Sequence, residues 1–75
     1  MTKKDQKILK DAEQKQIPVF VITAKDANSL QALREYLEIC VDDGCSLAHI
    51  AGIQDRIEEF EKWQAKNIDL VKQPD

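Results

Sequence analysis

The feature that most constrains this chain is residues 17–26, IPVFVITAKD, the only stretch with the composition of a β-strand. Its centre consists of β-branched and aromatic residues, which fit a pleated, half-buried surface. Pro18 stands near its start, where a missing backbone N–H is tolerated. Because a lone strand leaves its backbone hydrogen-bonding groups unpaired, the fold depends on what this segment pairs with.

Two partners are open to a strand over residues 17–25. One is the weakly strand-like segment 68–71, IDLV. The other is the same strand of a second chain, which we favour because an unpaired apolar edge promotes aggregation. The sequence therefore predicts a homodimer, and the residues of its dimer strand are Val19, Phe20, Val21, Ile22 and Thr23.

Two amphipathic helices are expected after the strand. Asn28 or Ser29 caps the first, whose apolar residues recur three and four positions apart, and Gly44 ends it. Ser46 is a good N-cap for the second helix, which extends to Asn67. A connection this short predicts an antiparallel hairpin of the two helices.

The expected fold class is α+β, with one N-terminal strand, an antiparallel two-helix hairpin, and the strand paired with a second chain. Residues 1–16 form a basic arm or a short helix. Residues 17–75 form a single strand–helix–helix domain with a short C-terminal tail. Gly52 lies inside the second helix, where it costs about 1 kcal/mol relative to Ala. We expect this glycine to allow close approach of the first helix.

The charge of the chain argues against nucleic acid as the main partner. The net charge is −3, with residues 1–16 at +2 and the remainder at −5. A basic arm that touches DNA or RNA stays a minor hypothesis, because acidic residues interrupt its lysines and it lacks arginine. The chain shows no signal peptide and no membrane-spanning stretch, so we expect a cytoplasmic protein with free thiols.

Cys40, Cys45 and His49 come nearest to a metal or catalytic set. Their spacing lacks the close cysteine pairs of zinc sites and a clear fourth ligand. Cys45 precedes a helix N-terminus with His49 one turn on, but no third group orients that pair. We therefore expect no metal, no cofactor, no catalytic residue and no enzyme activity.

Two sets of residues are candidates for binding. The partner-binding set combines aromatic anchors with an acidic helix face, where a basic partner protein would dock. It consists of Tyr36, Asp55, Glu58, Glu59 and Trp63. The alternative set would hold a small ligand such as a nucleotide in a groove of the dimer. It consists of Lys25, Arg34 and Tyr36.

The ordered motifs of the chain resemble a group of small bacteriophage and prophage proteins. These motifs are PVFVITAKD at 18–26, DGCS at 43–46, EKWQ at 61–64 and PD at 74–75. The group typically reads PVFVLxAqD, two helices, a Trp-Gln pair and a closing Pro-Asp, and many members open each helix with Pro where this chain has Leu30 and Leu47. The resemblance implies a viral or prophage source, in the host cytoplasm, and no particular chemistry.

The function predicted from these observations is that of a small non-enzymatic, phage-encoded interaction protein that acts on a host or viral protein. The alternative is a protein that binds a nucleotide-like small ligand. The sequence does not identify the partner or the ligand.

Overall fold

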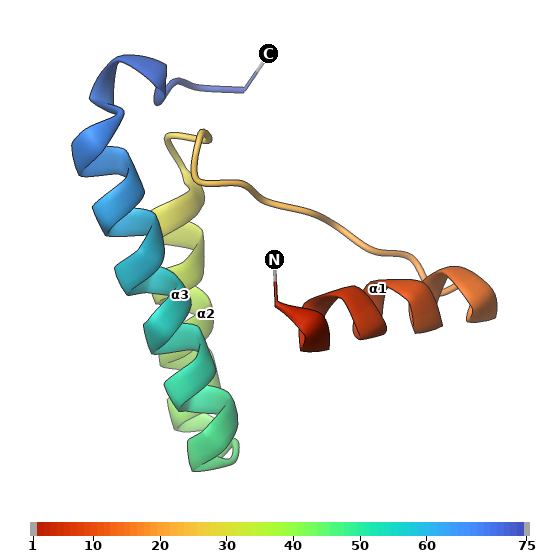
Figure 1. Ribbon diagram of the computed structural model, residues 1–75. Coiled ribbons are helices and arrows are strands. Elements are labelled where there is room, and N and C mark those ends of the chain that lie inside the picture. The colour runs from red at the N-terminus through yellow and green to blue at the C-terminus, as the bar shows by residue number, and fades with distance from the viewer. Residues whose placement is uncertain (1, 75) are drawn as a thin grey trace.

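The computed structural model describes residues 2–74, and all of its regular secondary structure over that range is helical. Its elements are α1 (Lys3–Lys15), α2 (Ser29–Asp42), α3 (Leu47–Lys66) and a 3₁₀ turn, η1 (Ile68–Leu70). Helices α2 and α3 pack side by side as a hairpin, and α1 runs across them at a distance (Figure 1). The α+β fold class was wrong, because no strand forms among the described residues.

Residues 17–23 connect α1 to the hairpin as an extended linker instead of a strand (Figure 1). Val19, Phe20 and Val21 are 51, 86 and 61% exposed. Strand composition alone does not make a strand, because a ladder needs a second strand and the described chain supplies none. The predicted pairing of this segment as a strand with a second chain is therefore not a feature of the fold.

The expected helical hairpin is confirmed. The Ser46 side chain accepts a hydrogen bond from the backbone N–H of His49 at the start of α3. Gly44 adopts a left-handed conformation with φ 72°, and the N–H of Cys45 donates to the Cys40 carbonyl at 3.0 Å. These features satisfy backbone hydrogen-bonding groups at the end of α2, and the chain reverses direction within four residues.

The start of α2 differs in detail from the sequence prediction. Asn28 occupies the N-cap position, but its side chain makes no capping hydrogen bond. Asp26 Oδ1 instead accepts from the N–H of Asn28 at 2.8 Å, which forms a turn stabilised by an aspartate side chain. The Gln31 side chain donates to Glu35 at 3.5 Å and takes no part in the cap.

Of the two predictions for residues 1–16, a basic arm or a short helix, the structure shows a helix, α1, that is capped at both ends. The Thr2 hydroxyl accepts from the N–H of Asp5, and the Asp5 carboxylate accepts from the N–H of Thr2. Gln16 closes the helix in the left-handed conformation, and the N–H of Ile17 donates to the Ala12 carbonyl at 2.9 Å. Both ends are thus satisfied locally, without help from the hairpin.

The tail returns to the linker, although segment 68–71 forms a 3₁₀ turn and not the alternative second strand. The N–H of Lys72 donates to the Lys25 carbonyl, and the N–H of Ala27 donates to the Lys72 carbonyl. This single parallel bridge, between Asp26 and Lys72, is the only β-type pairing within residues 2–74.

The buried core is small. Its hydrophobic members are Ala12, Cys40 and Ile53. The predicted role of Gly52 in bringing α2 close was wrong, because a Cβ added there would meet no atom within 4 Å. No helix of the described chain has the length and apolar character needed to cross a membrane.

Candidate interaction surfaces

A hollow of about 240 Å³ opens between the N-terminal half of α1 and the hairpin. We call it the Gly52 hollow, because this residue leaves open space on the α3 side. Apolar side chains from all three helices line it, with polar groups from α1 and α3 around them. Its lining consists of Thr2, Lys4, Asp5, Ile8, Leu33, Tyr36, Ala48, His49, Gly52, Ile53 and Arg56.

Tyr36 and His49 form one wall of the Gly52 hollow. The Tyr36 hydroxyl and His49 Nε2 share a hydrogen bond of 3.2 Å, and the two rings meet edge to face with centroids 6.0 Å apart. A hydrogen bond with the Cys40 thiol, together with that group's charge and partial burial, raises the pKa of Tyr36.

One ion pair joins α1 to the hairpin among the described residues. Arg56 on α3 bonds the Asp5 carboxylate at 3.2 Å and the Glu59 carboxylate at 3.0 Å. The capping bond from Thr2 is the largest cause that lowers the pKa of Asp5, with a smaller contribution from Arg56. This contact is half-exposed, so it positions α1 weakly.

The acidic residues predicted to dock a partner lie on α3, and other side chains neutralise them in part. Glu59 pairs with Arg56, and Glu58 pairs with Lys62 at 3.0 Å. Asp55 lies with them around a shallow, polar hollow beside Thr2. Pairs of this exposed kind contribute little to stability, so these carboxylates remain available to a partner.

Trp63 lies far from Tyr36 along the hairpin. It is partly buried near the C-terminal end of α3, 14 residues after His49, the hydrogen-bond partner of Tyr36. That separation corresponds to about 21 Å along a helix. The two predicted anchors therefore belong to different surfaces. The turn after α3 adds Ile68 and Leu70, which are 75 and 47% exposed, to the surface near Trp63.

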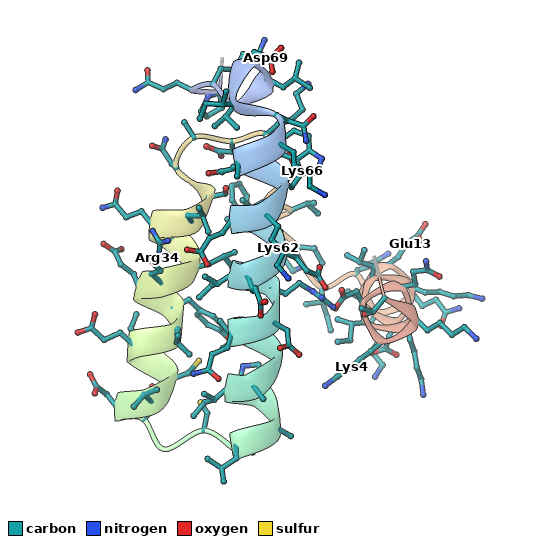
Figure 2. The ribbon with its side chains drawn as sticks, turned by 60° about the vertical axis from the view of Figure 1, so that its left-hand side comes forward. Lys4, Glu13, Arg34, Lys62, Lys66 and Asp69 are labelled. Carbon is teal, nitrogen blue, oxygen red and sulfur yellow. The ribbon has the colours of Figure 1, made fainter. Side chains whose placement is uncertain are left out.

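The alternative ligand-binding residues are not brought together. Lys25 lines a hollow with the tail, beside Lys72 and Pro74. Arg34 lies on α2 and pairs with Glu61 at 3.0 Å. In Figure 2, α3 stands between α2 and α1, so Arg34 lies on the side of the hairpin away from α1. Tyr36 lines the Gly52 hollow. A single small ligand therefore has no common site among these three side chains.

The two cysteines are free, with Cys40 buried and Cys45 partly exposed. A hydrogen bond with the Cys40 thiol and partial burial raise the pKa of Cys45, which disfavours the reactive thiolate. His49 directs Nε2 to Tyr36. No group of histidine, cysteine and acidic residues with metal-binding geometry occurs within residues 2–74.

Sequence reasoning missed two features of these surfaces. It placed Phe20 in a paired strand, whereas this ring is 86% exposed. It also gave no role to Gln64, whose side-chain amide donates to the Ala24 carbonyl and to Ser29 Oγ. The Trp-Gln pair of the phage-protein resemblance was the only signal for Gln64, because a polar residue on a helix shows no periodicity of its own.

The chain matches no protein-family model, and comparison with curated proteins and with solved structures finds no similar protein.

Proposed function

We propose that this chain is a small, non-enzymatic, phage-encoded interaction protein that binds a host or viral protein and works as a homodimer. The observation that carries the proposal is the number of large hydrophobic side chains left in contact with solvent. They are Ile8, Ile17, Val19, Phe20, Val21, Tyr36, Ile39, Val41, Leu47, Ile68 and Leu70. Exposed apolar surface of this extent is typical of proteins that bind other proteins.

The surface proposed for the host or viral partner is the C-terminal end of α3 with the following turn. Trp63, Ile68 and Leu70 supply apolar contact area there. Upstream on the same helix, the acidic residues supply charge that would guide a basic partner and limit wrong ones. The resemblance to small phage and prophage proteins favours a host or viral protein as that partner.

The test uses Ile68→Ser and a matched control, Leu47→Ser. Both residues are apolar and highly exposed, at 75 and 84%, but they lie at opposite ends of α3, Leu47 as its first residue and Ile68 just after its last turn. Truncation of such exposed side chains should change the free energy of unfolding by less than about 0.5 kcal/mol. Trp63→Ala is less informative, because loss of a partly buried indole would also destabilise the fold.

We expect the tagged wild-type protein and Leu47→Ser to capture the same protein from phage-infected cells. Capture by Ile68→Ser should fall at least about tenfold, as expected for loss of an anchor residue. Thermal melts of the three proteins should agree within a few degrees. Equal capture by all three would reject the proposed surface, and a lack of any reproducible protein would count against the function.

A further inference from the structure

We infer that two copies of this chain associate reciprocally, with Phe20 of each copy inserted into the Gly52 hollow of the other. The inference rests on the homodimer of the proposed function and assigns residues to it. It needs no strand pairing, because the contact is made by a side chain in a hollow. The host or viral partner would use the other end of the hairpin.

The single chain exposes more surface than a compact monomer of its mass. The chain exposes 6269 Å² at a mass of 8.6 kDa. A compact monomer of that mass exposes about 4,700 Å², so the excess is about 1,600 Å². A standard interface buries about 800 Å² of each partner. A second copy can cover such an area on both molecules at once, whereas a small ligand cannot.

Phe20 is the side chain best placed to enter another molecule. It is the most exposed of the large hydrophobic residues, at 86%, and lies in the middle of the extended linker. The apolar residues on either side, Val19 and Val21, are also more than half exposed. No backbone–backbone hydrogen bond holds residues 18–22 within the described chain, so the linker can follow the surface of a partner.

The Gly52 hollow has the size and lining that an aromatic ring requires. Its volume is about 240 Å³. An apolar cavity of about 150 Å³ already holds benzene. Ile8, Leu33 and Ile53 provide apolar contacts, and the Tyr36 ring provides an aromatic neighbour. At position 52 the absence of a side chain keeps this space open.

Charge favours a second copy as the source of the ring. Helix α1 carries five lysines and three acidic residues, a net charge of +2. Helices α2 and α3 carry four basic and seven acidic residues, a net charge of −3. Phe20 lies five residues after the end of α1, so its insertion would bring α1 of one copy close to the acidic hairpin of the other.

Within the single chain, the lysines of α1 form no ion pair with the acidic residues of the hairpin among the described residues. The one ion pair between them in the described part of the chain places the acid on α1 and the base on α3. Lys3, Lys4, Lys7 and Lys10 form no ion pair within residues 2–74. Lys4 lies on the side of α1 that faces the hairpin (Figure 2), and it is one of the residues that line the Gly52 hollow.

The experiment measures the mass of the purified full chain by sedimentation equilibrium across a range of concentrations. Two variants each remove one half of the contact. Phe20→Asp removes the ring and keeps the hollow, and Gly52→Leu fills the hollow and keeps the ring. Leu47→Asp is the control, because Leu47 is 84% exposed and does not line the hollow. Circular dichroism checks that each variant stays helical.

We expect a dimer for the wild type and for Leu47→Asp. The dissociation constant should rise at least about 100-fold in Phe20→Asp and in Gly52→Leu, as for the loss of a central hot spot. An equimolar mixture of these two variants should form a heterodimer more tightly than either variant pairs with itself. In that mixture one intact ring still meets one intact hollow.

A wild-type monomer at about 100 μM would overturn the inference, as would a dimer that Phe20→Asp or Gly52→Leu leaves unchanged. The absence of a heterodimer from the mixture would also reject the reciprocal contact. These measurements contain no third protein. Failure here therefore leaves the host or viral interaction open, and failure of the Ile68→Ser test leaves the dimer open.

Discussion

The side chain of Gln64 joins three segments at one end of the hairpin. Its amide donates to the Ala24 carbonyl at 3.0 Å and to Ser29 Oγ at 3.3 Å. Ser29 Oγ in turn donates to the Asp26 carbonyl at 2.7 Å. With an exposed fraction of only 1%, Ser29 is the most buried side chain of the described residues. The network thus fixes the turn before α2 against the end of α3.

We predict that Gln64→Ala destabilises the protein by about 1–2 kcal/mol, because two partly buried acceptors lose their donor. The measurement is urea unfolding followed by circular dichroism. Gln54→Ala is the matched control, since Gln54 is an exposed glutamine on the same helix whose side chain makes no hydrogen bond to the residues that the structure describes. Equal midpoints for the two variants would show that the network has no energetic role.

Helix α1 is an element that the chain stabilises mainly from within. Its capping box at Thr2 and Asp5 and its left-handed residue Gln16 satisfy both ends. Few contacts tie it to the hairpin, and it runs across that hairpin rather than along it (Figure 1). The Asp5 carboxylate takes part in both the cap and the ion pair with Arg56. Protonation of this one carboxylate therefore weakens both contacts.

This arrangement predicts a dependence of α1 on acid. The pKa of Asp5 is lowered from 3.8 in the folded chain, first by the Thr2 hydrogen bond. A lowered pKa contributes stability that is fully present above pH 3.8 and is lost as pH falls through the folded value. We expect the amide signals of α1 in nuclear magnetic resonance spectra to lose helical shifts as the pH falls below the ordinary range of an aspartate, because the pKa of Asp5 is lowered.

Asp5→Asn provides the comparison for this titration. The amide keeps an acceptor oxygen but has no charge to lose, so α1 should start less ordered at pH 7 and respond less to acid. Signals of α2 report the acid sensitivity of the rest of the protein. Identical titrations of α1 in the wild type and Asp5→Asn would contradict a role for this carboxylate.

At the scale of the whole molecule, exposed surface is the dominant feature. Within residues 2–74, the buried hydrophobic residues are Ala12, Cys40 and Ile53, whereas eleven large hydrophobic residues are exposed. A chain of 75 residues has little stability to spare, because a core of this size supplies at most a few kcal/mol. Association through the exposed surface would add to that stability by mass action.

We therefore predict that the melting temperature of the wild type rises with protein concentration. A shift of several degrees between about 2 and 200 μM is expected if unfolding is coupled to dissociation. Differential scanning fluorimetry measures the shift. Phe20→Asp should melt at one temperature throughout this range, and a wild type without any shift would indicate that the fold is stable as a single chain.

The sequence by itself determined the elements with local causes. Periodic apolar residues and the caps at Ser46 and Gly44 predicted both helices and their antiparallel connection, because these signals act over four or five residues. Thr2 and Asp5 form a capping box that is also a local sequence signal. It was overlooked because the segment was interpreted from its lysine-rich composition.

The tertiary structure decided what those elements meet. Residues 17–25 have the composition of a strand, yet a strand exists only where a second one is within hydrogen-bonding reach. The tail offered one bridge at Lys72 and no ladder, so the segment remained an extended linker with Phe20 in solvent. The separation of Tyr36 from Trp63 and the open space at Gly52 likewise depend on packing between distant segments, which no local pattern of residues encodes.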